Sequence, residues 1–293
     1  MVELPAWLWQ PLLKMLILPI RSRQSAKLYQ SIWLEEGSPL AVYSQRLAQN
    51  IQQNLGVRFK VCLAMRYGSP SIASALQTLQ ADANIRSIMV LPLYPQYAAA
   101  TTASCFDAIA DFFKQQRVIP TLHFINAYFA HPAYLNALAA HLQQEMKPDH
   151  DYLLFSFHGL PQRSVDLGDP YEKQCFATAH QLAQTLSLAT HQYQVVFQSR
   201  FGRTQWLQPY CEAVLAELPK RGIRRVTVTC PGFAVDCLET LEEIAKRYRE
   251  IFLQAGGEAF YYIPALNDDP RHSAGLATLI RESVNAQNLE SNQ

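Results

Sequence analysis

A histidine at the end of an apolar segment is the side chain in this sequence best placed for chemistry. Residues 152–157 predict a buried strand, and Gly159 and Pro161 end it directly after His158. Open α/β folds carry their reactive groups beyond the carboxyl ends of parallel strands. A neutral imidazole in that position can accept a proton or bind a divalent metal.

Three carboxylates follow a second apolar segment farther along the chain. Residues 226–229 predict another strand, and the sequence from Cys230 onwards opens a helix. Asp236, Glu239 and Glu243 are separated by three and then four positions, which puts them on one face of that helix. A histidine facing a row of carboxylates can collect protons from a substrate, hand over a divalent metal, or do both.

Each of these residues also has a purely structural interpretation. A histidine after a strand is commonly a hydrogen-bonded turn residue. Asp236 stands where a helix N-cap is expected, and Glu243 suits a solvated helix face. The spacing alone leaves both kinds of role open.

The composition is that of a globular enzyme. The chain has 293 residues, of which 49% are apolar and 17% charged, enough for a sizeable core and long enough for two α/β units. The net charge of +1 gives no indication of a nucleic-acid partner. Six cysteines are scattered without a CxxC pair, so we expect a reducing, cytoplasmic location.

The apolar segment at residues 6–20 has two interpretations. It lacks the basic start and the cleavage site of a signal peptide, and it is too short to span a bilayer. It is either a core helix or an apolar surface that rests on a membrane. Arg21, Arg23 and Lys27 follow it and favour peripheral contact with the inner face of a membrane.

Strand and helix patterns alternate along the chain, which predicts parallel sheets with helical crossovers. Predicted strands cover residues 59–65, 87–93, 121–125, 152–157, 194–197, 226–229 and 260–263. Predicted helices cover residues 44–54, 71–80, 105–115, 132–145, 171–187, 206–218, 237–255 and 270–285. Because the first half has three strands and the second has four, we expect an N-terminal strand to be absent from this sequence.

Seven motifs in fixed order give the chain a family resemblance. It resembles the bacterial type of protoporphyrin ferrochelatase from about residue 4 to about residue 270. The matching segments are residues 31–40, 64–70, 91–97 with Thr101 and Thr102, 156–161, 168–171, 197–202 with Trp206 and Leu207, and 230–243.

The resemblance implies an α/β fold of two similar Rossmann-like domains. The first would span residues 1–126 and the second residues 127–267, with residues 268–293 forming a helix that returns to the first. Family members open with a strand and a loop that forms one wall of the porphyrin cleft, and we expect that segment to be absent here.

The resemblance also implies the reaction and the site. Fe(II) is inserted into protoporphyrin IX, with release of two protons and no organic cofactor, as the last step of haem biosynthesis. His158 matches the family's metal-side histidine and Glu239 its essential glutamate, while Glu243 and Asp236 would relay protons or iron. The residues matching the porphyrin pocket are Trp206, Tyr67, Tyr94 and Tyr97.

Two further expectations concern what the protein binds. The cysteine trio that holds an iron–sulfur cluster in some members is absent near the C-terminus, so we expect no cluster. Alternative functions are a chelatase for coproporphyrin and a non-catalytic tetrapyrrole- or metal-binding protein. Porphyrin fluorescence quenching without turnover would distinguish the latter.

Overall fold

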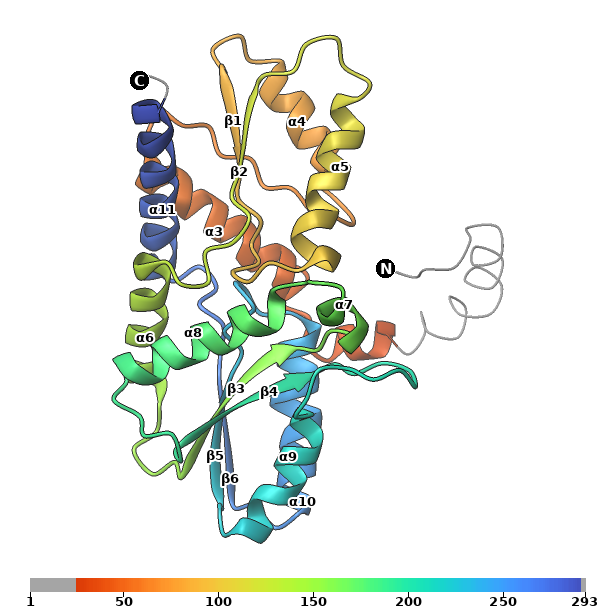
Figure 1. The fold of residues 1–293 in the computed structure, drawn as a ribbon, viewed down its shortest axis with the longest axis vertical. Coiled ribbons are helices and arrows are strands. Elements are labelled where there is room, and N and C mark those ends of the chain that lie inside the picture. Colours follow the sequence, from red (N-terminus) through yellow and green to blue (C-terminus); the bar gives the residue numbers. More distant parts are fainter. Residues whose placement is uncertain (1–24, 291–293) are drawn as a thin grey trace.

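The computed structural model describes residues 25–290 (Figure 1). The apolar segment at residues 6–20 and any strand at the start of the chain lie outside the described residues. Within residues 25–290, no helix is long and apolar enough to cross a membrane.

Helices and parallel strands alternate, as the sequence predicted. The strands are β1 (Ser87–Val90), β2 (Thr121–Phe124), β3 (Tyr152–His158), β4 (Tyr193–Gln198), β5 (Arg225–Thr229) and β6 (Ala259–Ile263). The α-helices are α3 (Pro39–Leu55), α4 (Ile72–Gln80), α5 (Ser104–Phe113), α6 (Pro132–Glu145), α7 (Gln162–Asp166), α8 (Tyr171–Thr185), α9 (Cys211–Glu217), α10 (Arg249–Gln254) and α11 (Pro270–Glu290). Three helical segments of other geometry are η2 (Ala99–Ala103), η3 (Leu218–Arg221) and η4 (Glu239–Tyr248).

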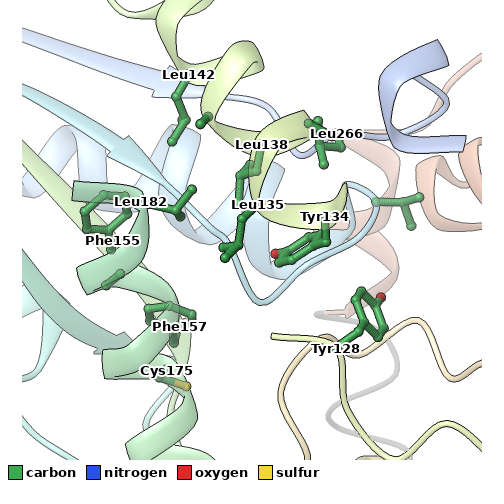
Figure 2. Close-up of a cluster of buried hydrophobic side chains, with 14 of the residues drawn as sticks. Tyr128, Tyr134, Leu135, Leu138, Leu142, Phe155, Phe157, Cys175, Leu182 and Leu266 are labelled. Carbon is green, nitrogen blue, oxygen red and sulfur yellow. The ribbon is translucent and has the colours of Figure 1, made fainter. Parts of the chain in front are cut away.

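The larger sheet has the order β4-β3-β5-β6, and all its strands are parallel. Residues 152–157 of β3 are all buried, which is typical of a central strand covered on both faces. On one face Phe155 and Phe157 belong to a hydrophobic cluster that also contains Leu182 of α8 and Leu138 of α6 (Figure 2). The opposite face packs against α9, η4 and α10.

Within residues 25–290, the smaller sheet contains β1 and β2. The strand predicted at residues 59–65 is wrong, because this segment joins no ladder in the described part of the chain. Its backbone groups bond locally instead: the Val61 N–H donates to Oε1 of Gln52, and the Met65 N–H donates to the Pro70 carbonyl. An apolar pattern is therefore present here without the neighbouring strand that a ladder requires.

Two predicted helices also differ from the structure. The helix expected from residue 206 begins at Cys211, because Pro209 lacks a backbone N–H and disfavours helical geometry at the residue before it. The helix expected over residues 237–255 is a π-helix in η4 and becomes α-helical only from Arg249. A π-helix of this length is rare, and π-turns occur frequently at functional sites.

The last helix joins distant parts of the chain. α11 packs against both α3 and α6 (Figure 1). A Cβ atom on Gly275 would lie 2.8 Å from the Ala133 carbonyl oxygen, so only glycine permits this approach of α11 to α6. The division into domains at residues 126 and 127 stays a prediction.

Candidate active site

The first reactive group stands at the carboxyl end of β3. His158 is half-buried and pairs in register with Gln198 of β4. Its Nδ1 lies 2.7 Å from the Gly159 carbonyl oxygen. Because a carbonyl oxygen only accepts, Nδ1 carries the hydrogen, and the lone pair on Nε2 remains available for a proton or a metal ion.

Two neighbours hold the backbone around His158. The Gly159 N–H donates to the Gln198 carbonyl oxygen at 2.7 Å. A Cβ atom on Gly159 would lie 2.7 Å from the Gln198 carbonyl oxygen and 3.1 Å from the Trp206 ring. Glycine is therefore needed for β4 and the Trp206 indole to approach the chain directly behind His158.

The second reactive group opens the π-helix. Glu239 is the first residue of η4, and its carbonyl oxygen accepts a hydrogen bond of 2.8 Å from Nε2 of Gln198. The Gln198 side chain is itself held, because its Oε1 accepts from the Ser156 hydroxyl at 2.8 Å. Burial, reinforced by the Glu239 charge, raises the pKa of the adjacent Cys237 thiol and keeps it protonated.

One cavity of about 1820 Å³ brings these groups together. His158, Glu239, Trp206, Tyr67 and Tyr94 all line it. It is larger than the usual small-molecule pocket of roughly 300–1,000 Å³. Burial raises the pKa of Tyr94 to about 12, so its phenol stays neutral and can donate a hydrogen bond at physiological pH.

The structure does not bring Asp236 to this cavity. Its side chain is 2% exposed and precedes the helix. Its oxygens accept hydrogen bonds from Tyr262 Oη at 2.5 Å, Thr240 Oγ1 at 2.8 Å and Asn267 Nδ2 at 2.7 Å. Asp236 thus ties the start of η4 to β6 and to the loop before α11.

Glu243 lies in a second network, also outside the lining of the cavity. Its carboxylate accepts hydrogen bonds from the Ser199 N–H and hydroxyl and from the Tyr248 hydroxyl. The Arg247 guanidinium lies 3.0 Å from its Oε1. Burial, with the Glu243 charge, raises the pKa of Tyr248. The expected relay residues Asp236 and Glu243 therefore have separate sets of partners.

Tyr97 is likewise not among the residues that line the cavity. Its backbone N–H donates to Oε1 of Gln174 at 2.7 Å. Sequence reasoning overlooked Gln174, Gln198 and Tyr171, which support the site with neutral side chains. The sequence offered one indication for Gln198 and Tyr171, which is that both lie inside matched motifs. Neutral side chains lack the charge by which catalytic candidates are usually selected from a sequence.

Comparison with known proteins identifies the family. The ferrochelatase family model matches residues 1–284. The chain belongs to the ferrochelatase family. It is 49% identical over 283 residues to the ferrochelatase of Photobacterium profundum, which covers 96% of this chain and 87% of that protein. Identity to the ferrochelatase of Edwardsiella ictaluri is 50% over 282 residues, covering 95% of this chain and 87% of that protein.

Solved structures confirm the class of fold. SirB from Bacillus subtilis with Fe3+ matches with a TM-score of 0.59 and 14% identity, covering 84% of this chain and 92% of that chain. DR2241 from Deinococcus radiodurans, a multi-domain protein with structural similarity to chelatases, matches with a TM-score of 0.54 and 14% identity, covering 82% of this chain and 50% of that chain. The parallel α/β architecture is thus a chelatase-type fold.

The prediction of a porphyrin metal chelatase of haem synthesis is confirmed by this family membership. The matches favour neither a coproporphyrin chelatase nor a non-catalytic binding protein.

Proposed function

We propose that His158 and Glu239 carry the metal and proton chemistry by which Fe(II) enters protoporphyrin IX. The supporting observation is that both side chains line one cavity although they come from different elements, the end of β3 and the start of η4. Trp206, Tyr67 and Tyr94 supply aromatic lining suited to a flat macrocycle.

Metal insertion replaces two pyrrole protons by one divalent ion, so the products balance in charge. The Nε2 lone pair of His158 accepts one proton, and the Glu239 carboxylate accepts the other. Either group can also contact the incoming iron before it reaches the ring nitrogens. The relay role of Glu243 and Asp236 stays a prediction, as does the absence of an organic cofactor or iron–sulfur cluster.

The test compares His158→Ala and Glu239→Gln with the control His180→Ala, which changes an exposed histidine on α8. Each protein is mixed anaerobically with Fe(II) and protoporphyrin, and the Soret band follows metalation. We expect the two site variants to lose about 10²–10⁴-fold in kcat, as removal of a positioned acid or base does. Porphyrin fluorescence quenching should persist. Metalation by His158→Ala at the rate of His180→Ala would contradict the assignment.

We also propose that the protein is cytoplasmic and contacts the inner face of a membrane through residues 6–20. The supporting observations are the apolar character of that segment, the basic residues after it and the exposure of Trp33, which is 56% accessible. Sedimentation with anionic but not neutral lipid vesicles, reduced by salt, is the expected result. Absence of sedimentation with anionic vesicles would contradict it.

A further inference from the structure

Three hydrogen bonds join residues 96–99, which follow β1, to residues 169–178, which contain the first half of α8. The Tyr97 N–H donates to Oε1 of Gln174 at 2.7 Å, and the Ala99 N–H donates to Oδ2 of Asp169 at 2.8 Å. The Gln96 side chain donates from Nε2 to the Thr178 hydroxyl at 2.9 Å. Residues 96–99 thus use side chains of the segment 169–178 as bonding partners, where a strand would use a neighbouring backbone.

Asp169 bonds to the N-termini of two helical segments at once. Its Oδ2 receives the N–H of Ala99, the first residue of η2, which runs directly into α5. Its Oδ1 receives the N–H of Tyr171, the first residue of α8, at 3.1 Å. Neither segment has a side-chain cap at its own preceding residue. One carboxylate therefore satisfies both, with its charge at the positive end of each helix dipole.

This connection extends on one side to the part of the cavity lining that contains the proposed reactive histidine. Tyr171, whose N–H bonds Asp169, lines the same cavity as His158. On the other side, residues 96–99 continue directly from Tyr94, which lines the cavity. In Figure 1, α8 crosses the middle of the molecule between the two sheets. The hydrogen bonds of Asp169 and Gln174 thus connect two parts of the cavity lining. One part contains Tyr94 (the Tyr94 wall), and the other contains His158 (the His158 wall).

The packing around Gln96 leaves little room for these walls to shift. Gln96 is 2% exposed. A Cβ atom on Gly232 would lie 3.3 Å from Oε1 of Gln96 and 3.3 Å from the Phe157 ring. The chain at Gly232 therefore packs closely against the Gln96 side chain. This packing leaves few alternative positions for residues 96–99 once their hydrogen bonds have formed.

We propose that Asp169 and Gln174 are positioning residues for metal insertion, which hold the Tyr94 wall of the cavity at a fixed place relative to His158. The inference rests on the proposed site at His158 and Glu239. Insertion requires the macrocycle to lie accurately against the proton acceptor, and small misplacements cost large factors in rate. Neither residue touches the reacting atoms, so both act through the walls they hold.

The test exchanges the acceptor that Gln174 provides. Gln174→Met keeps the shape of the side chain but removes the oxygen, whereas Gln174→Glu keeps an oxygen for the Tyr97 N–H. Gln181→Ala is the control, because Gln181 lies on the same helix without a bond to residues 96–99 in the described part of the chain. Each variant is assayed for kcat at saturating Fe(II) and porphyrin, for porphyrin affinity by fluorescence quenching, and for thermal stability.

We expect Gln174→Met to lower kcat about tenfold, which corresponds to the loss of one hydrogen bond at a site that sets geometry. Gln174→Glu should recover to within about twofold of the unchanged protein, and Gln181→Ala should equal it. Asp169→Asn, which retains one acceptor oxygen, should be less impaired than Asp169→Ala.

Equal kcat for Gln174→Met and the unchanged protein would overturn the proposal. Equal losses in Gln174→Met and Gln174→Glu would also overturn it, because they would show a packing role and not an acceptor role. The His158→Ala variant separates this result from a failure of the proposed site. Full activity of His158→Ala overturns the site itself, whereas an inactive His158→Ala beside a fully active Gln174→Met overturns only the positioning role.

Discussion

Both sheets contribute residues to the lining of the cavity, but the sheets themselves are unequally supported. In the four-stranded sheet, residues 152–157 of β3 are all buried, and β4 and β5 flank β3 on either side. In the two-stranded sheet, β1 has a single fully buried position, and the nearby residues 59–65 join no ladder in residues 25–290. The proposed proton acceptor His158 is attached to the well-supported sheet. The aromatic residues Tyr67 and Tyr94 follow the weakly supported segments, and side-chain hydrogen bonds hold residues 96–99 after Tyr94.

This difference indicates that the two walls have different roles, one in proton exchange and the other in bordering the substrate. Groups that exchange protons need a fixed direction, which a central strand provides through its ladder and its packing. A wall that borders a large flat substrate needs only correct spacing, which a few hydrogen bonds to α8 can set. If support determines stability, truncations in the four-stranded sheet should cost more unfolding free energy than truncations in the two-stranded sheet.

The largest effect should come from a matched pair of leucine truncations. Leu154→Ala in β3 removes a side chain with no exposed surface and should lower the free energy of unfolding by about 3–5 kcal/mol. Leu122→Ala in β2, where the leucine is half-buried, should lower it by about 1–2 kcal/mol. Urea unfolding of both variants checks the comparison. Equal losses would show that the two sheets are equally well packed.

Acidification should lower the free energy of unfolding through His272, which lies where α11 joins distant parts of the chain. This residue lies in α11, which packs on both α3 and α6, and it is 1% exposed. Burial lowers its pKa from 6.5 to about 4, so it is neutral in the folded protein. As the pH falls below 6.5, the unfolded chain takes up a proton that the folded protein does not. Stability contributed by the neutral state is therefore lost between about pH 6.5 and about pH 4, by about 3 kcal/mol in all.

Urea unfolding of the unchanged protein and of His272→Gln, at neutral pH and near pH 5, isolates this contribution. The variant lacks the titrating group and should lose less stability on acidification. Parallel pH dependence in the two proteins would exclude His272 as the source.

The smallest change in unfolding free energy is expected from a comparison of two neighbouring tyrosines of β6. The Tyr262 hydroxyl bonds the buried Asp236, whereas the Tyr261 hydroxyl bonds the exposed side chain of Asp149. Tyr262→Phe leaves a buried carboxylate oxygen with one donor fewer and should cost about 1–2 kcal/mol. Tyr261→Phe should stay within about 0.5 kcal/mol of the unchanged protein. A larger loss in Tyr261→Phe would reverse the expected contrast between interior and surface bonds.

The sequence predicted the better-supported region well because its signals are local. The apolar run of β3 and the Gly159 and Pro161 that end it are contiguous, so the position of His158 follows from a short stretch of chain. The place of Glu239 after β5 was likewise predicted, whereas its distinction from Asp236 and Glu243 came from the family resemblance. A continuous apolar run also predicted a strand at residues 59–65, but no local pattern reveals whether a second strand lies beside it.

The hydrogen-bond partners of Asp236 and Glu243 could not be predicted, because they too depend on residues distant in sequence. The partners of Asp236 include Tyr262 and Asn267, and those of Glu243 include Ser199, all distant in sequence. Spacing by three and four positions also does not distinguish an α-helix from a π-helix. Pro209, in contrast, was available in the sequence as a reason to begin α9 later than residue 206.

The π-helical geometry of η4 has a consequence for insertions and deletions in this protein. Glu243 and Tyr248 are five positions apart, and their side chains bond to each other while Glu243 also holds Ser199. An α-helix closes its turn over four positions and a π-helix over five. Deleting one residue between them would favour ordinary α-helical closure and would disturb the spacing at which Glu243 bonds both Tyr248 and Ser199. The five-position closure of η4 is thus coupled to the carboxylate that anchors the loop after β4.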